Sequence, residues 1–580
     1  MKINNFINGQ KYRWLLPTTD NELIKYLMNN LGISRVIAIF LVSRGKIELD
    51  QARNFLYSSI NDVPHPSLMK DCAKAVERVK KAIDNKEKIL IVGDYDVDGI
   101  TSTSMLMTCV PLLGADINFY LPNRVKDGYG LSVKIVEKAA AYNYKVIITV
   151  DNGISAVLPA QRAKELGIDL IITDHHRPQA VLPPAYAIVD PHQEDCQYPY
   201  KYLAGVGVIF KFLSLLFESC KKDLPTKVYE LLLLGTVADV VPLTGENRYW
   251  VRFGLNHVNA RDSLALNNLK LNSNCNRPSI TSSDIGFFLA PQINALGRLD
   301  DARDGVYFLI GSDEERVTKI GQNLKNFNEA RKEIEKSIFE EVEEKIKSKE
   351  IDLDKELIII AGSTNWPAGV IGLVASRIVA KYGRPTILLH ITSEGVLKGS
   401  CRSINAFNMF DALQENADLL MQFGGHSVAA GLALKQVDLL EFKNRLETRA
   451  RKFLTEDDLV LKVTVDGFID PENLDDSMLE ELAFLEPFGH QNESPLFILE
   501  NLVFAKAPIL MKGLHVKCFI KSPDKQKVFS LVFFNRPDIW ELLQTNLNFD
   551  ALVKISENFW QGEKNLELIG IDIHLKNVER

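Results

Sequence analysis

Three aspartates stand close enough in this sequence to share one metal ion. They occur in the stretch KILIVGDYDVDGITST, residues 88–103, as Asp94, Asp96 and Asp98. The apolar run before them, residues 89–92, predicts a buried strand, and the hydroxyl-rich residues after Gly99 predict the start of a helix. Three like charges on one turn repel one another unless a cation binds between them, and hard cations prefer oxygen ligands. The sequence therefore favours a metal site on this turn.

Two other interpretations of the same turn need no catalytic metal. One is an acidic turn that faces solvent, and this alternative stays open. The other is a calcium-binding loop, whose pattern requires a glutamate at its twelfth position. Counted from Asp94, that position is Met105, which offers no carboxylate. The calcium loop is therefore disfavoured.

Two more apolar runs end in side chains of the same kind. Residues 146–150 and 170–173 are followed by Asp151-Asn152-Gly153 and by Asp174-His175-His176. Residues 154–167 between them predict a crossover helix, which brings all three turns to one edge of a parallel sheet. In GTVADVVP, residues 235–242, Asp239 stands among apolar neighbours, where a lone carboxylate is costly unless it is paired or binds metal. Together these stretches predict a site for more than one metal ion.

The elements that position these residues predict an α/β protein of several domains. We expect a helical segment at 1–60, a metal-binding domain at 61–250, a helical connector with a long amphipathic helix at 251–355, a second α/β domain at 356–452, and a small β-barrel of the oligonucleotide-binding (OB) kind at 455–580. Most aromatic side chains of the terminal domain are expected in the barrel core.

Composition limits the function classes. The chain has 580 residues, 46% apolar and 25% charged, with a net charge of −7, so a surface for nucleic acid must be a local basic patch. We expect no membrane span and no secretory signal. The seven cysteines are scattered and form no Cys-x-x-Cys pair, which fits reduced thiols in the cytoplasm. We expect the protein to be a monomer.

Several stretches outside the acidic turns could bind phosphate. Asn294 and Arg298 stand four residues apart and share a face if they are helical. In GSCRS, residues 399–403, small residues would let backbone amides and the Arg402 guanidinium approach a phosphate. Plainer explanations remain open: the polar stretch 121–132 could be an ordinary turn, and His426 in FGGHSVAAG could be a core histidine.

The motifs GDYDVDG, DNG, DHH and VADV, followed by GGHSVAAG, resemble the DHH phosphoesterase superfamily with its associated DHHA1 domain. Further motifs resemble the RecJ exonucleases of that superfamily: PNRVKDGYGLS, AGVGVIFKF, QINALGRLDDA, GVIGLVASRI, KGSCRS and LEPFGHQNESPLF. The likeness runs from about residue 60 to the end. It implies a DHH parallel-sheet domain and a DHHA1 α/β domain joined by a long helix, plus a C-terminal OB-like barrel.

The resemblance also implies a site. It would hold two Mn²⁺ or Mg²⁺ ions, one on Asp96 with Asp94 nearby, the other on Asp98, His175 and Asp239, with Asp151 bridging both. His176 would face the scissile phosphate, and Asp151, His176 and Arg298 would be the catalytic residues. The candidate nucleic-acid contacts are then Arg124, Tyr129, Asn294, Arg298, Arg377, Ser400, Arg402, Ser403 and His426.

The resemblance implies that the protein is a metal-dependent exodeoxyribonuclease, which degrades single-stranded DNA from its 5′ end. The implied role is in DNA repair and recombination. A single-strand-binding protein and a RecQ-type helicase are partners that only the resemblance implies. The alternatives are a DHH-family phosphoesterase for short oligonucleotides or cyclic dinucleotides, an inorganic pyrophosphatase or polyphosphatase, and a non-catalytic DNA-binding scaffold.

Overall fold

The structure is a computed structural model that describes residues 5–122, 130–275, 277–299, 301–523, 525–545, 548–560 and 563–576. The chain divides into two compact units. Unit 1 comprises residues 1–19, 329–475 and 495–580, and unit 2 comprises residues 20–328 and 476–494. Each unit is therefore built from segments that are far apart in the sequence.

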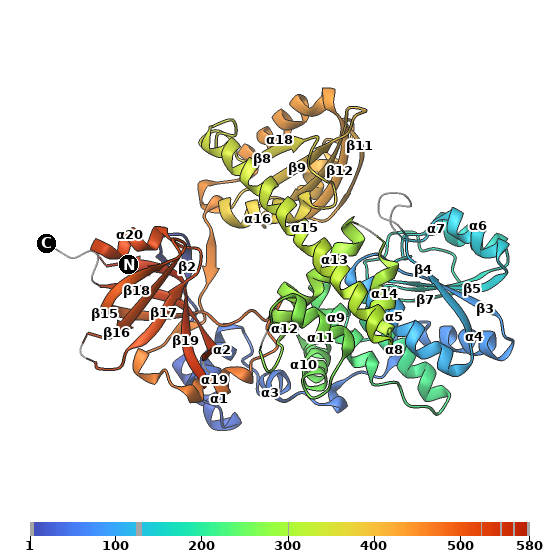
Figure 1. Ribbon diagram of the computed structural model, residues 1–580, viewed down its shortest axis with the longest axis horizontal. Coiled ribbons are helices and arrows are strands. Elements are labelled where there is room, and N and C mark those ends of the chain that lie inside the picture. Colours follow the sequence, from blue (N-terminus) through green and yellow to red (C-terminus); the bar gives the residue numbers. More distant parts are fainter. Residues whose placement is uncertain are drawn as a thin grey trace. The chain divides into compact units, whose positions relative to one another are not determined.

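A five-stranded parallel sheet forms the centre of one half of unit 2 (Figure 1). Its order is β4-β3-β5-β6-β7, with β3 (Lys88–Val92), β4 (Asp116–Tyr120), β5 (Tyr144–Val150), β6 (Asp169–Thr173) and β7 (Ala187–Val189). Side chains alternate along each strand, so Ile89 and Ile91 enter one hydrophobic core and Leu90 and Val92 enter another. Because both faces are buried, the strands are apolar throughout, as is typical of parallel sheets.

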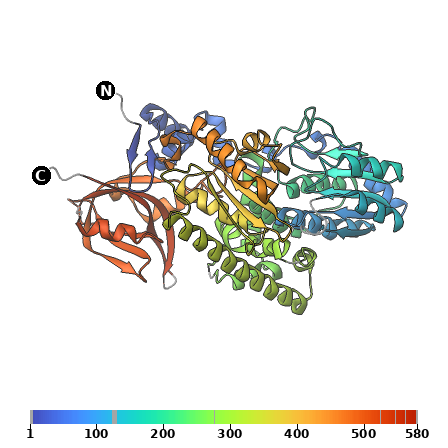
Figure 2. The same cartoon turned by 90° about the horizontal axis from the view of Figure 1, so that it is seen from above.

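Helices cover both faces of this sheet (Figure 2). One core contains residues of α4 (Cys72–Asp84), α5 (Val97–Cys109), α8 (Gly205–Ser219) and α9 (Lys227–Ala238). The other contains residues of α6 (Val133–Ala141) and α7 (Val157–Glu165). Because β3, β5 and β6 are parallel, they all end at the same edge of the sheet, and the segments that follow them emerge there, as the sequence predicted.

The rest of unit 2 is helical. It contains α1 (Asn21–Leu31), α2 (Arg35–Ser43), α3 (Leu49–Tyr57), α10 (Gly245–Asn259), α11 (Leu264–Asn272), α12 (Ser282–Asp284), the π-helix η4 (Ile285–Leu289), α13 (Ala290–Leu299) and α14 (Arg303–Ile310). It also has short 3-10 turns at Ile60–Asp62, Pro66–Leu68 and Val110–Leu113. Residues of α10, α11 and α14, which we expected in a separate connector, pack into the same core as the sheet.

The long helix that the sequence predicted is present as α15 (Glu314–Lys347), which begins in unit 2 and ends in unit 1. Its C-terminal half packs on the α/β part of unit 1 through Ile338 and Val342. That part has a sheet of order β11-β12-β10-β9-β8. The elements are β8 (Ile359–Ser363), α16 (Ile371–Tyr382), β9 (Thr386–Ile391), β10 (Val396–Arg402), α17 (Met409–Gln414), β11 (Leu420–Gly425), β12 (Ala429–Lys435) and α18 (Leu439–Phe453).

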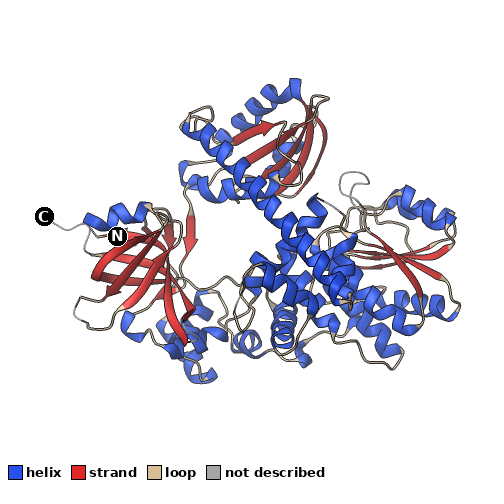
Figure 3. Cartoon of the chain, in the orientation of Figure 1, coloured by secondary structure: helices blue, strands red, loops and turns tan. Residues whose placement is uncertain are grey.

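The terminal part of unit 1 is a closed barrel, consisting mostly of strands (Figure 3). The ring runs β15-β16-β17-β19-β18 and closes by pairing of β18 with β15. Its strands are β15 (Phe497–Met511), β16 (His515–Lys521), β17 (Phe529–Phe533), β18 (Phe549–Trp560) and β19 (Glu563–Leu575), with α20 (Asp538–Thr545) beside them and β14 (Gly467–Phe468) added to β15. Phe529 and Phe533 are buried, as expected for core aromatics, whereas Phe534 is exposed.

The first residues depart from the expected helical segment. Strands β1 (Phe6–Asn8) and β2 (Arg13–Leu15) form a hairpin that pairs with β13 (Lys462–Thr464). The reason is a buried carboxylate, Asp572, which accepts hydrogen bonds from the backbone N–H groups of Lys11 and Tyr12 and from the indole N–H of Trp14. The helices of the expected segment begin only at α1; α19 (Asp476–Ala483) belongs to unit 2 as well.

Within the described residues, no helix has the length and apolar character that crossing a membrane requires.

Candidate metal centre and phosphate-binding residues

The turn after β3 presents three carboxylates in different ways. Asp94 is 3% exposed. Asp96 caps α5, because its Oδ1 accepts a hydrogen bond from the Gly99 N–H at 3.0 Å. Asp98 lies in the first turn of α5 and is 1% exposed. Strand, cap and helix together fix the three side chains at one point of the sheet edge.

The N-terminus of α8 fixes Asp98 more closely. The N–H groups of Gly205 and Val206 donate to its two carboxylate oxygens at 2.6 and 2.8 Å. A Cβ on Gly205 would lie 2.8 Å from the Asp151 Cβ and 2.9 Å from the Asp98 Oδ2, so only glycine fits there. The motif AGVGVIFKF therefore has a physical role that its sequence did not disclose, which is to position two expected metal ligands.

Asp151 follows β5 directly and is 3% exposed. Its φ of 61° lies in the left-handed region, which is uncommon for a residue other than glycine. The next side chain, Asn152, holds the turn, since its amide donates to the Val92 and Val150 carbonyls and accepts from the Leu131 N–H. The ends of β3 and β5 are thereby connected beside the carboxylate.

The turn after β6 contains the two histidines. Asp174 is 1% exposed and accepts hydrogen bonds from the backbone N–H groups of Ile154, His175 and His176. Its Oδ1 also lies 2.7 Å from the His176 Nδ1, and an ionised carboxylate only accepts, so Nδ1 carries the hydrogen. Burial raises the pKa of Asp174, but His176, His175 and the Ile154 N–H together outweigh it and hold that pKa below its ordinary value.

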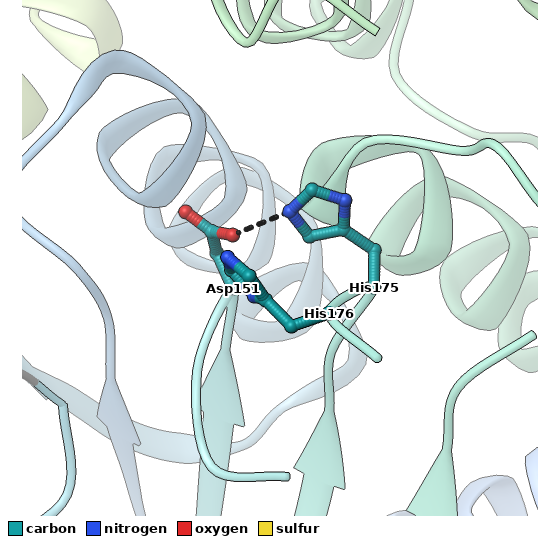
Figure 4. A group of neighbouring side chains, drawn as sticks. All are labelled: Asp151, His175 and His176. Carbon is teal, nitrogen blue, oxygen red and sulfur yellow. Dashed lines mark ion pairs between the residues drawn. The ribbon is translucent and has the colours of Figure 1, made fainter. Parts of the chain in front are cut away.

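His175 lies among three carboxylates from three different elements (Figure 4 shows the nearest). Its Nε2 is 3.1 Å from Asp151, 3.7 Å from Asp239 and 3.9 Å from Asp98. Asp239 is the C-terminal cap of α9. Burial alone would lower the pKa of His175, but the surrounding carboxylates outweigh it and raise that pKa.

The ligand atoms of these residues form three overlapping groups, each within 4.8 Å: Asp94, Asp96 and Asp151; Asp98, His175 and Asp239; Asp151, His175 and His176. The first two groups bring together the residues that the resemblance implied for each ion, and Asp151 belongs to the first group and lies 3.1 Å from His175 of the second. His176, which we expected to face the phosphate, lies near enough to be a ligand as well.

The chemistry of the cluster fits divalent cations. Within the described residues, Asp239 Oδ2 and His175 Nε2 are buried and make no hydrogen bond. Burial, reinforced by neighbouring carboxylates, raises the pKa of Asp98 to about 6 and that of Asp239 to about 8, and raises that of Asp151 well above its ordinary range. Such crowding of acids is relieved by positive charge, and the carboxylate oxygens, which are most of the ligand atoms, suit Mn²⁺ and Mg²⁺.

One acidic residue at this edge escaped the sequence analysis. Asp190 follows β7 and is fully buried, and its Oδ1 accepts the His192 N–H at 2.7 Å. Burial raises the pKa of Asp190 to about 8. The signal in the sequence is the apolar run AIV before Asp190, which repeats the pattern of the other three strands but is only three residues long.

The predicted helix with Asn294 and Arg298 is α13, and it lies against the first acidic turn. The Asn294 Oδ1 accepts the Val97 N–H at 3.1 Å. A Cβ on Gly297 would lie 2.3 Å from the Tyr95 carbonyl oxygen, which explains a glycine within this helix. Arg298 therefore stands one residue from a direct backbone contact with the metal turn.

In unit 1, the Arg402 guanidinium contacts two hydroxyls. Its Nε donates to Ser376 on α16 at 3.1 Å and its Nη1 donates to Ser400 at 3.2 Å. Arg377 forms an ion pair with Glu335 on α15 at 3.1 Å.

The remaining candidate nucleic-acid contacts differ in exposure and in hydrogen bonding. The Ser403 hydroxyl donates to the Phe407 carbonyl at 2.7 Å, and His426 is exposed in the turn after β11. His426 is therefore not a core histidine. Arg124 and Tyr129 lie outside the described residues.

Comparison with known proteins agrees with this arrangement. Three family models match: the DHH family N-terminal domain at residues 88–236, the DHHA1 domain at 354–455 and the RecJ OB domain at 465–572. The chain is 36% identical to the single-stranded-DNA-specific exonuclease RecJ of Bacillus subtilis, over 97% of this chain and 70% of that protein. It is 37% identical to the protein of the same name from Salmonella typhimurium, over 86% and 89%.

Among solved structures, RecJ of Thermus thermophilus in complex with Mn²⁺ superposes with a TM-score of 0.82 at 27% identity, covering 97% of this chain and 79% of that one. The matched regions include the acidic turns, the DHHA1 sheet and the barrel. The chain therefore belongs to the RecJ family of single-stranded-DNA-specific exonucleases.

Proposed function

We propose that this protein hydrolyses single-stranded DNA from its 5′ end with two Mn²⁺ or Mg²⁺ ions, in cytoplasmic DNA repair and recombination. The observation that carries the proposal is a pair of neighbouring ligand groups at the edge of the parallel sheet, one of which contains Asp151 and the other His175, 3.1 Å from Asp151. Family membership supplies the substrate, since the curated relatives are named for single-stranded DNA.

The proposed ligands follow the observed groups. Asp94 and Asp96 would hold one ion and Asp98, His175 and Asp239 the other, and Asp151 would be shared between them. Two ions bound there supply an activated hydroxide at neutral pH and offset the negative charge that develops on the phosphate. The α8 amides that bind Asp98 fix where one ligand set stands relative to the bridging carboxylate.

His176 is proposed to act on the phosphate through its Nε2. Asp174 accepts the Nδ1 hydrogen and thereby sets the ring orientation. The side chain is 46% exposed, so it can meet a substrate. Burial lowers the pKa of His176, but the Asp174 carboxylate outweighs it and raises that pKa, which favours the protonated ring whose Nε2 can donate a hydrogen bond to a phosphate oxygen.

Phosphate binding away from the cluster is assigned to two arginines. Arg298 on α13 stands beside the metal turn and is proposed to bind the phosphates next to the cleaved bond. Arg402, with Ser400 and Ser376, presents a guanidinium and two hydroxyls near the start of α16, a combination that suits a terminal phosphate. We propose that Ser400 and Arg402 bind the 5′ phosphate.

The barrel is proposed to hold the rest of the strand. Along β16, Lys517, Phe519 and Lys521 alternate with buried residues and are half-buried. Lys506 and Lys517 both lie 5.6 Å from the Phe519 ring centre. An aromatic ring between two cations binds bases and phosphates without reading sequence. A phosphoesterase for short oligonucleotides or cyclic dinucleotides would not need this surface. We propose that the protein acts as a monomer. The resemblance implies a single-strand-binding protein and a RecQ-type helicase as partners.

The test is digestion with Mn²⁺ of three substrates: a single strand labelled at its 3′ end, the same strand with a blocked 5′ end, and the duplex. We expect shortening from the 5′ end of the free single strand only. Asp151→Asn should abolish turnover while DNA binding persists, and Asp116→Asn, which removes an exposed acid at the opposite end of the sheet, should retain activity.

Each other outcome contradicts part of the proposal. Degradation of short fragments but of no long strand would favour the short-oligonucleotide phosphoesterase. Hydrolysis of pyrophosphate without DNA cleavage would favour a pyrophosphatase. Binding of DNA without cleavage would leave the non-catalytic scaffold.

A further inference from the structure

Two phenylalanines on the π-helix η4 are exposed to solvent. Phe287 is 75% exposed and Phe288 is 47% exposed. The Ala290 N–H donates to the Ile285 carbonyl, which is the wide turn of a π-helix. Gln292, 1% exposed, donates to the Phe288 carbonyl at 2.9 Å and so stabilises the irregular turn. π-Helical turns inside α-helices often mark functional sites, and this turn leaves two large aromatic side chains in water.

The helical rod formed by η4 and α13 lies along the metal cluster. At its first end, a Cβ on Gly286 would lie 3.7 Å from a methyl carbon of Val237, two residues before Asp239. Toward its other end, Asn294 binds the Val97 N–H, next to Asp96. Phe288 precedes Asn294 by six residues, about 9 Å at the rise of a helix. The aromatic pair therefore stands within a few nucleotides' reach of the expected metal ligands.

The accessible side of the rod has a consistent chemistry. Phe288, Pro291, Asn294 and Arg298 recur at helical spacing and none of them is buried, whereas the residues between them are buried except Gly297. This stripe runs from an aromatic ring to an amide and then to a guanidinium. An aromatic surface that continues into a cation matches a strand of unpaired nucleotides, which offers flat bases and phosphates together.

We propose that Phe287 and Phe288 form a stacking platform for unpaired bases of the strand whose phosphates reach the metal centre. The platform rests on the proposed function and adds a contact that none of the expected site residues provides. Bases in a duplex are stacked on their neighbours and paired, so their faces are not available to the platform. It therefore contributes to the preference for single strands, independently of sequence.

The experiment is a scan with abasic residues. Single-stranded substrates carry one abasic residue at successive positions from the 5′ end, and kcat and KM are measured with Mn²⁺ for each. In the wild-type protein, one short run of positions should raise KM at least about fivefold, the lower limit for one lost base–aromatic stack. In the variant Phe287→Ala/Phe288→Ala, KM on intact DNA should rise by a similar factor and the abasic residues should have no further effect.

Two variants separate stacking from a structural role. Phe287→Trp/Phe288→Trp retains aromatic faces and should restore both KM and the sensitivity to abasic residues. Tyr142→Ala removes an aromatic that is 69% exposed just before β5, at the amino end of the sheet, and should change neither. Thermal unfolding should be unaltered in the alanine variant, because both side chains are exposed.

The failures are distinguishable. If wild-type protein cleaves single strands but the alanine variant has unchanged KM on every substrate, the platform is refuted and the proposed function stands. If the variant lowers kcat equally on intact and abasic DNA, the pair acts on the helix geometry and the platform is also refuted. If wild-type protein cleaves no single strand, the proposed function fails first.

Discussion

Removing one acid from the metal cluster should stabilise the metal-free protein. Burial, with Asp98 and Asp96 adding to it and His175 opposing it, raises the pKa of Asp239 from its ordinary 3.8 to about 8. Asp239→Asn replaces the carboxyl by an uncharged group of the same shape. The variant should therefore lose the electrostatic penalty of the cluster and also one metal ligand.

The size of the effect follows from the pKa. The pKa of Asp239 is higher in the folded protein than in the unfolded chain. The Asp239 carboxyl therefore does not change the free energy of unfolding below about pH 4, and it lowers that free energy by about 1.4 kcal/mol per pH unit as the pH rises toward 8. At about pH 7 the penalty is slightly more than 4 kcal/mol, and at about pH 5 it is between 1 and 2 kcal/mol. These are ceilings, because the other carboxylates of the cluster readjust when Asp239 is neutral.

The assay compares unfolding of both proteins in EDTA and in Mn²⁺ at these two pH values. In EDTA the variant should melt higher than wild type, by about 8 °C at about pH 7 and by less at about pH 5. With Mn²⁺ at about 100 times its dissociation constant, wild type should gain about 2.7 kcal/mol for each ion bound, and the variant less because it has lost a ligand. Hydrogen exchange in β5 and β6 assigns the transition to unit 2.

Asp116→Asn is the matched control, since it removes one exposed carboxylate from the same sheet and should stay within about 0.5 kcal/mol of wild type. Equal melting of wild type and Asp239→Asn in EDTA at both pH values would refute the claim that crowded charge destabilises the cluster. A gain that does not grow with pH would refute its assignment to the Asp239 carboxyl.

Three further changes test the parts that position the site. Gly205→Ala brings a Cβ to 2.8 Å from Asp151 and should weaken Mn²⁺ binding at least about tenfold by calorimetry. Asp174→Asn should lower kcat by about 10- to 100-fold while Mn²⁺ affinity persists, because His176 loses the negative charge that raises its pKa. Asp572→Ala leaves the buried Trp14 indole N–H and the N–H groups of Lys11 and Tyr12 without their acceptor and should destabilise unit 1 by about 3 kcal/mol or more, seen as faster hydrogen exchange in residues 5–16.

The sequence predicted the metal turns because each one follows a short apolar strand, and parallel strands end at a common edge. It could not show what fixes those turns. The contacts of Asp98 with α8, of Asn152 with β3 and of Asp174 with His176 join residues through space, with no periodicity that marks them in the sequence. Asp190 was missed for a simpler reason, since β7 has only three residues.

The N-terminal hairpin shows a second limit. Its strands have three residues each, and β13, with which β2 pairs, lies more than 440 residues further along the chain. Local patterns carry no information about a partner at that distance, and the apolar spacing of the later helices extended the expected helical segment over it. The exposure of Phe287 and Phe288 could not be predicted for a different reason. Aromatic residues in an amphipathic helix are ordinarily assigned to the core.

Several features at the expected metal ligands oppose stability. Asp151 has a φ of 61°, and Val240, the residue after Asp239, has a φ of 58° although β-branched side chains strongly disfavour that region. Backbone strain of this kind costs about 1–3 kcal/mol per residue. Positive φ also occurs at other described residues, such as Asn143 and Lys349, but at the ligands it coincides with crowded carboxylates and with the close approach at Gly205. A fold selected for stability alone would relax each of these features, so their concentration at one sheet edge is itself an argument that this edge binds cations.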